Sequence, residues 1–257
     1  MPSPSGLIRP ERRLAVIASL TLVTILSWAY VVHLARMSGM STGLPMDMPG
    51  MPASFAATFL ALFAMWVAMM AGMMLPAVLP TVLLFATIAR QRRQTGRAQL
   101  SVSAFVLGYL LVWGGFSALA AQLQTRLSVA LLDLAPHTRS AGVAAGVLLL
   151  LTGAYQWTAF TTACLNHCRS PIAHFTAHWH EGAGGALRMG AEHGALCLAC
   201  CWLLMALLFV GGVMNPLWVG GLALLVLLER LVPRGDLVGR IAGVGLAVWG
   251  LTLIVRR

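Results

Sequence analysis

Long apolar runs separated by short polar segments dominate the chain. A helix needs roughly 20 apolar residues to cross a bilayer core about 30 Å thick. Seven runs approach this length, at residues 14–34, 55–89, 101–123, 140–160, 193–213, 216–232 and 238–255. The pattern predicts an all-α fold: one integral membrane domain over residues 1–257, a polytopic bundle of about seven transmembrane helices.

Two of these runs have features that affect the predicted number of crossings. The run 14–34 follows an arginine-bearing start like that of a signal peptide, but no small-residue cleavage site closes it, so we expect a retained first helix. The run 55–89 is too long for one straight span, and Pro76 and Pro80 are expected to kink it. Two crossings within 55–89 would invert every later loop.

The composition agrees with lipid as the solvent, because 59% of the 257 residues are hydrophobic and only 9% are charged. The formal net charge is +10, and all 17 basic residues are arginines. They lie in short clusters between the apolar runs, which indicates membrane topology and no nucleic-acid partner. The absence of lysine excludes a retinal Schiff base and a phosphate-binding loop of the G-x-x-x-x-G-K type.

The distribution of arginines predicts the orientation. With the N-terminus inside, twelve arginines fall on the inner side and five on the outer side. Bacterial membrane proteins concentrate basic residues in their cytoplasmic loops. The sequence therefore predicts a multi-pass protein of the bacterial inner membrane, with its N-terminus inside and its C-terminus outside.

The stretch 65-MWVAMMAGMMLP-76 is unusually rich in methionine. At about 100° per residue, Met65, Met69 and Met73 form one stripe on a helix, and Met70 and Met74 form a second row beside it. Methionine is adaptable packing material in membrane helices, but its thioether is also a soft metal ligand. The spacing leaves both interpretations open.

The segment before that helix, 37-MSGMSTGLPMDMPGM-51, holds five more methionines among Gly, Pro and Ser. No core needs filling in such a segment, and thioethers favour Cu(I) over harder cations. Outside the membrane, where thiols oxidise, methionine is the usable soft ligand. We expect a copper collector there, with a plain methionine-rich linker as the alternative; its residues are Met37, Met40, Met46, Met48 and Met51.

A third cluster is 193-HGALCLACCW-202, which places His193, Cys197, Cys200 and Cys201 within an arc of about 100° on a helix. One imidazole and three thiols can fill most of the coordination shell of a metal ion. Cu(I) is the expected metal, and Zn(II) is the less favoured one. The alternative is that these cysteines are small hydrophobes in a buried helix.

Upstream, the stretch 164-CLNHC-168 also combines Cys and His residues and is expected near the cytoplasmic interface. Its candidate ligands are Cys164, His167 and Cys168. A helix rises 1.5 Å per residue, so Met73, Met74 and the thiols of the third cluster are expected in the same inner half of the membrane. They would form one site or two steps of a relay.

The acidic residues suggest how transport would be driven. We expect Asp133, Glu181, Glu192, Glu229 and Asp236 in loops or at helix ends. A carboxylate at mid-membrane would mark a proton relay, and none is predicted. Without such a relay or a nucleotide site, copper would move downhill or by ligand exchange, and no enzymatic activity is expected.

Four motifs, in order along residues 55–235, carry a resemblance to a known family. They comprise Met65, Trp66, Met69, Met73, Met74, Leu75 and Pro76; Cys164, Cys168 and Pro171; Cys197, Cys200, Cys201, Trp202 and Met205; and Gly212, Met214 and Asn215. Together they resemble the bacterial predicted metal-binding integral membrane proteins, a domain-of-unknown-function family. Some of its members are regarded as membrane copper chaperones that serve copper oxidases such as tyrosinases.

The resemblance implies metal binding by the matched Met and Cys residues. The chain departs from the family pattern at Ala77, Ala199 and Arg230, where Ser, Gly and Lys are frequent. None of these three is expected to touch a ligand.

The leading hypothesis is a Cu(I)-binding chaperone or insertion factor for a cuproenzyme, with a cuproenzyme client or a periplasmic copper carrier as its partner. One alternative is a passive copper channel. Another is a quinone-linked thiol oxidase using Cys197 and Cys200. The expected position of Cys164 and Cys168 on the same inner side argues against the oxidase, which needs a second pair facing the oxidising side. The sequence does not predict the oligomeric state.

Overall fold

The chain folds into α-helices in a computed structural model that describes residues 10–40, 55–91, 98–132, 139–169, 175 and 179–255. No strand occurs among these residues, so the all-α prediction is confirmed for them. The helices are α1 (Pro10–Met40), α2 (Phe55–Gln91), α3 (Ala98–Leu132), α4 (Arg139–Tyr155), α5 (Ala159–Arg169), α7 (Gly182–Ala206), α8 (Leu208–Gly211), α9 (Pro216–Leu231) and α10 (Gly235–Val255).

Five helical segments in the described part are long and apolar enough to cross a membrane: α1, α2, α3, α7 continued through α8, and α10. The pair α4 and α5 makes a sixth if it is one span, broken by a bend of 65°. The remaining run, α9, has 16 residues, which is shorter than the roughly 20 that a straight span needs. The protein thus has the helix pattern of a multi-pass membrane protein, with five or six candidate spans by length alone.

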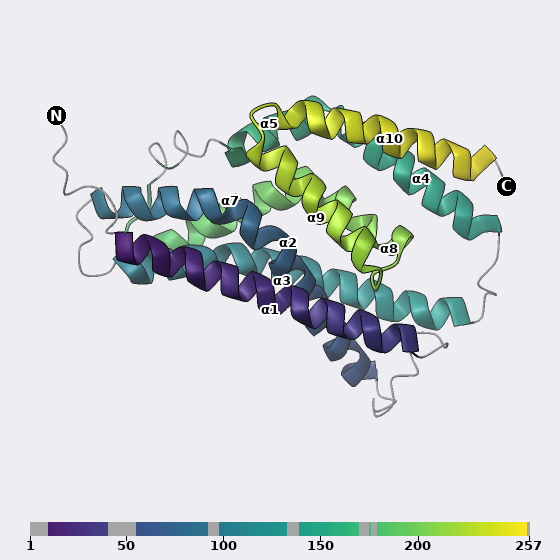
Figure 1. Ribbon diagram of the computed structural model, residues 1–257, viewed down its shortest axis with the longest axis horizontal. Helices are drawn as coiled ribbons and strands as arrows, with labels where there is room; N and C mark the ends of the chain where they lie inside the picture. The colour runs from purple at the N-terminus through teal and green to yellow at the C-terminus, as the bar shows by residue number, and fades with distance from the viewer. Residues whose placement is uncertain are drawn as a thin grey trace.

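The long helix α2 is uninterrupted, and Pro76 and Pro80 lie inside it. Figure 1 shows α2 changing direction along its length, as prolines inside a helix can cause. No turn breaks the helix at which the chain could reverse. One crossing is therefore the simpler interpretation of this run.

Helix α7 begins at Gly182, well before residue 193, where the apolar run starts. Glycines, Arg188 and Glu192 make this stretch resemble a loop, but the glycines serve packing. A Cβ built on Gly190 would lie 2.0 Å from the backbone oxygen of Phe105 in α3. Small residues let membrane helices approach this closely, so α7 extends along α3.

The early start of α7 corrects the expected depth of the thiols. Cys197 lies about 22 Å from Gly182 along the helix axis, at 1.5 Å per residue. It is therefore near the middle of α7 and not in its first turns. The stripe from Met65 to Met74 lies about 15–28 Å along α2 from Phe55, so both clusters fall in the central parts of their helices.

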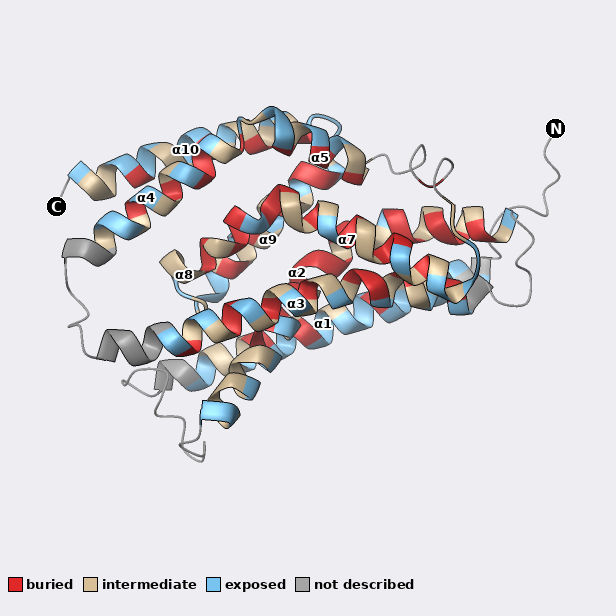
Figure 2. Cartoon of the chain, turned by 180° about the vertical axis from the view of Figure 1, so that it is seen from behind, coloured by how far each residue is buried: buried red, intermediate tan, exposed pale blue. Residues whose placement is uncertain are grey.

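The helices form a main body and an outer pair. In Figure 1, α4 and α10 run side by side, and α9 lies between them and the body formed by α1, α2, α3 and α7. Figure 2 shows buried residues gathered on α2, α7 and α9. In the most apolar stretch of α2, 61% of residues are buried, against 17% in α1 and α10. Helices α1 and α10 thus leave most of their apolar residues exposed, as helices that face lipid do, and α2, α7 and α9 carry the interior.

Candidate metal centre

Three cysteines share one buried face of α7. Cys197, Cys200 and Cys201 are exposed by only 0%, 4% and 2%. The thiols of Cys200 and Cys201 each donate a hydrogen bond to the backbone oxygen of Cys197, at 3.0 Å. Residues three and four positions apart lie over one another on a helix. The three sulfur atoms therefore gather around one turn in the middle of α7.

Arg230 of α9 points its guanidinium group into this cluster. One nitrogen, Nη2, lies 3.0 Å from Cys197 Sγ and 3.3 Å from Cys200 Sγ, and 3.4 Å from the backbone oxygen of Cys197. The arginine is 8% exposed. A cation that donates to two sulfurs stabilises their thiolate forms. Cys197 and Cys200 are thus the pair best prepared to bind a metal as thiolates.

Tyr109 of α3 closes the cluster from the other side. Its hydroxyl is 3.0 Å from Cys197 Sγ, and its side chain is fully buried. Gly194 of α7 allows this approach, since a Cβ there would already lie 3.2 Å from the backbone oxygen of Tyr109. Cys197 is therefore held between an arginine from α9 and a tyrosine from α3.

The helix α5 adds a fourth thiol. The bend after α4 turns α5 against α7 and α9, which brings Cys168 next to Cys200. Cys164 lies one helical turn before Cys168 on the same helix and is also buried. All five cysteines are free and buried. The structure thus brings the cysteines of the two sequence clusters into one network.

The two candidate histidines differ in their surroundings. His193 is buried, and its ring packs against Phe105 and Tyr109, with ring centres 6.1 Å apart in each case, and against Phe175 at 6.5 Å. It lies one turn before Cys197 among these aromatic rings. His167 lies between Cys164 and Cys168 on α5 and is half-buried. Their ligand roles stay predictions.

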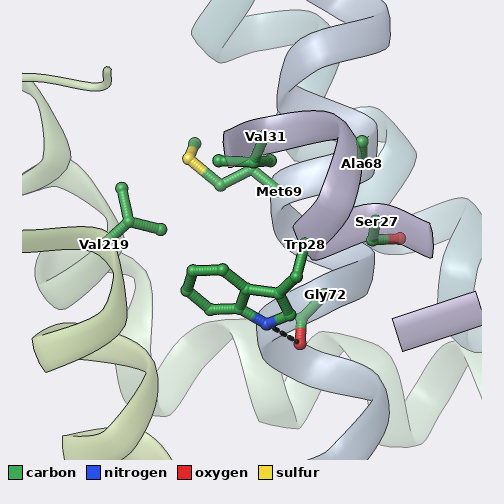
Figure 3. Close-up of a pocket in the computed structure, with 7 residues that line it drawn as sticks. All are labelled: Ser27, Trp28, Val31, Ala68, Met69, Gly72 and Val219. Carbon is green, nitrogen blue, oxygen red and sulfur yellow. Dashed lines mark hydrogen bonds between the residues drawn. The ribbon is translucent and has the colours of Figure 1, made fainter. Parts of the chain in front are cut away.

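The five methionines of α2 are all buried, with exposures between 0% and 3%. Met69 lies in a seam between α2, α1 and α9, beside Trp28 and Val219 (Figure 3). Trp28 Nε1 donates a hydrogen bond to the backbone oxygen of Gly72 at 3.3 Å, which fixes the indole over the methionine helix. This seam has no room for a water molecule, so Met69 is close-packed where it stands.

The methionines of α2 and the thiols belong to one continuous buried core. Helices α3 and α9 each pack against both α2 and α7. The two clusters are thus joined through shared neighbouring helices. Whether they form one site or a relay stays a prediction.

The methionines expected to collect copper lie mostly beyond the described residues. Met37 is on the last turns of α1 and is 47% exposed. Met40 is the last residue of α1, and Met46, Met48 and Met51 lie outside the described residues. An exposed Met37 fits a surface role.

Within the described ranges, no group of three or more His, Cys, Asp and Glu side chains is arranged to hold a metal ion. The set of His193 with three thiols is therefore not assembled as a four-ligand site, and it stays a prediction. What the structure does assemble is a thiol pair beside a cation. Structural zinc takes four ligands, whereas soft Cu(I) binds well to few sulfur ligands, so this donor set suits Cu(I) better.

Sequence reasoning missed two residues of this centre, Arg230 and Tyr109, and it missed the burial of Glu229. Arg230 was expected to touch no ligand, and that expectation was wrong. Its signal was the pair 229-ER-230 inside an apolar run, because a charge within a membrane span is functional by default. Glu229 does lie in the last turn of α9, but it is buried, and Gln156 Nε2 donates to its Oε1 at 2.7 Å. Tyr109 had no sequence signal.

Comparison with known proteins supports a copper-related role. No curated protein and no solved structure matches the chain significantly. The family model PpoB2, described as a copper chaperone, matches residues 63–253. The matched part includes the methionines of α2, the cysteines of α5 and α7, and Arg230. The chain belongs to the PpoB2 copper chaperone family.

Proposed function

We propose that this protein binds Cu(I) between Cys197 and Cys200 inside the membrane and passes it to a cuproenzyme. The observation that carries the proposal is the buried thiol pair that shares one guanidinium nitrogen of Arg230. Thiolates are among the strongest soft ligands for Cu(I). Membership of a copper chaperone family supports copper as the cargo.

Each ligand has a definite part in this proposal. The two thiols lose their protons when Cu(I) binds, since the thiolate is the ligand form. Arg230 and Tyr109 hold the Cys197 sulfur in place through hydrogen bonds. Cys168 and Cys201 border the pair and are the next available sulfurs. Transfer then proceeds as one sulfur replaces another at the metal, without an energy source.

The methionines extend this path. Met65, Met69, Met73 and Met74 offer weaker thioether ligands in the central part of α2. The segment with Met37 gathers copper at the outer surface. The partner is a cuproenzyme client or a periplasmic copper carrier at the bacterial inner membrane, and the protein carries out no chemical conversion of its own.

The direct experiment is an anaerobic titration of the purified, reduced protein with Cu(I) against a chromogenic chelator, followed by mixing with a copper-free acceptor cuproenzyme. Copper bound tightly by the protein and then released to the acceptor supports the proposal. Failure of the reduced protein to compete with the chelator at all would reject it.

The proposed topology has seven crossings with the N-terminus inside. In Figure 1, α1 begins at one end of the molecule and α10 finishes at the opposite end, which fits an odd number of crossings. The seven crossings are α1, α2, α3, α4 with α5, α7 with α8, α9, and α10. The short α9 is taken as a crossing of its own, and its packing against α2, α7 and α10 supports this assignment.

Reporter fusions test this topology. Because arginines cluster on the inner side, reporters at residues 45 and 136 are expected to be active outside the inner membrane, and one at residue 173 to be active inside. Alkaline phosphatase and a fluorescent protein provide the opposite readouts. An outside signal at residue 173 would mean that the chain crosses one time more or fewer than proposed.

A second expectation concerns the outer methionines. Replacing Met37, Met40, Met46, Met48 and Met51 together by leucine is expected to leave one copper bound per chain at saturating copper. Delivery at low external copper should fall severalfold, since the segment raises capture and not final affinity. Elemental analysis and an uptake assay at two copper concentrations measure this. Loss of all bound copper would show that the tight site lies in the outer segment.

A further inference from the structure

Arg230 is the one charged side chain that the structure places in hydrogen-bonding contact with the thiol pair, among the residues that it describes. Its Nη2 reaches both Cys197 Sγ and Cys200 Sγ, at 3.0 and 3.3 Å. An arginine keeps its charge at any physiological pH. The positive charge beside these two sulfurs is therefore permanent, and it is buried together with them.

We propose that Arg230 selects the charge of the bound metal, making the thiol pair a site for monovalent soft ions and disfavouring divalent ones. This inference rests on the proposed function, because it takes the Cys197 and Cys200 thiolates as the ligands. A monovalent ion with two thiolates carries a net charge of −1, which Arg230 neutralises. A divalent ion with the same two thiolates is already neutral, so the arginine leaves a buried charge of +1.

The cost of that extra charge is the physical basis of the selection. A buried net charge loses its hydration without compensation, whereas a balanced set of charges in contact loses much less. The site cannot relax by turning Arg230 to solvent, since the residue is only 8% exposed. The preference for Cu(I) over Zn(II) thus has a component of charge in addition to the softness of sulfur.

Glu229, the neighbour of Arg230 in α9, is a buried acidic residue common to all the proteins compared. Glu229 directs its carboxyl group to Gln156, which donates to it at 2.7 Å. It is present in the wild type and in every Arg230 variant. The change in metal preference between those proteins therefore reports the loss of the arginine charge from a site whose other side chains are the same.

The test uses Ag(I) and Cd(II), which are both soft, closed-shell ions and differ in charge. The full-length protein, reduced and in detergent, is titrated with each ion in competition with a chelator of known affinity. In Arg230→Gln, the ratio of Ag(I) to Cd(II) affinity should fall by about a hundredfold, because one partner of a buried charge pair is lost. In Arg230→Lys, which keeps the charge, the ratio should stay within about fivefold of the wild type.

Arg240→Gln is the matched control. Arg240 lies over the Trp157 ring at 5.8 Å, and removal of its charge should leave the ratio unchanged. If Arg230→Gln does not fold, Arg230→Leu is used in its place, because leucine replaces the arginine stem by an apolar side chain. The ratio of Ag(I) to Cd(II) affinity in this variant then tests the inference.

The outcomes separate the two proposals. An unchanged ratio in the neutral Arg230 variants overturns the inference, and so does a lysine variant that behaves like the glutamine one. If the wild type binds neither Ag(I) nor Cu(I), or binds them equally well after serine replaces Cys197 and Cys200, the proposed function itself fails. A ratio that falls with loss of the charge and is kept by lysine supports both.

Discussion

Replacing Cys197 and Cys200 together by serine is expected to remove most Cu(I) binding while the protein still inserts and folds. Serine nearly conserves the volume of cysteine but offers a hard hydroxyl in place of a soft sulfur. Its oxygen can still accept from Arg230, so the buried guanidinium keeps hydrogen-bond partners. The affinity for Cu(I) should fall by more than about a hundredfold. Mutation of residues that only hydrogen-bond to a metal ligand already lowers metal affinity tenfold to a hundredfold, and loss of the ligands themselves should lower it further. Titration against a Cu(I) chelator under reducing conditions measures the loss.

The matched control is Met69→Leu with Met73→Leu. Leucine nearly conserves the apolar volume of both buried methionines, of which Met69 lies in the seam beside Trp28 and Val219. The fold should therefore be kept, and Cu(I) binding should fall only partly. Wild-type affinity in the serine variant would show that the thiols only pack, with the methionines as the site. If neither variant changes copper binding, the metal hypothesis must be given up. A mixed disulfide trapped at Cys197 or Cys200 would then support the thiol-oxidase alternative.

A second large effect is expected from Gly190→Ala. The added Cβ would lie 2.0 Å from the backbone oxygen of Phe105 and 2.8 Å from its carbonyl carbon. Backbone atoms cannot rotate away as a flexible side chain can, so α3 and α7 must separate. We expect a loss of about 3 kcal/mol of stability, at the upper end of what overpacking usually costs. In detergent, this corresponds to a fall of roughly 6–12 °C in the unfolding temperature.

Gly184→Ala is the control for this substitution. Gly184 lies in the same helix, but a Cβ there would meet no atom within 4 Å. Alanine favours a helix over glycine by up to about 1 kcal/mol, so this variant should be as stable as the wild type or slightly more so. Equal unfolding temperatures for the two variants would contradict the close packing of α3 on α7. Separation of these helices should also weaken Cu(I) binding, because Tyr109 reaches Cys197 across this contact.

The sequence predicted the helices well wherever apolar residues run without interruption. The runs at 55–89 and 238–255 correspond closely to α2 and α10. It misjudged the start of α7, because Gly190 and Gly194 weaken an isolated helix but permit close packing when α3 is present. It also gave 140–160 as one span without a break, whereas the helix breaks at Gln156–Thr158 and turns by 65°. Both differences arise from contacts between helices, which the periodicity of apolar residues along the sequence does not indicate.

In the candidate site too, the features set by helical spacing were predicted, and those set by contacts between helices were not. The face shared by Cys197, Cys200 and Cys201 follows from helical spacing and was predicted. Cys168 was named as a candidate ligand, but its contact with Cys200 depends on the bend between α4 and α5. Arg230 comes from α9, far along the chain, and its charge was assigned to topology along with the other arginines. A side chain that crosses between helices leaves no periodic signal in its own segment.

X-ray absorption at the copper edge of the Cu(I)-loaded, full-length protein tests the central claim most directly. Sulfur and lighter ligands scatter differently, so the spectrum reports which atoms hold the metal. A shell of sulfur ligands alone, lost when serine replaces Cys197 and Cys200, is the result predicted here. A shell of nitrogen or oxygen ligands, or a sulfur shell unchanged in the serine variant, would contradict the proposal that this thiol pair is the copper site.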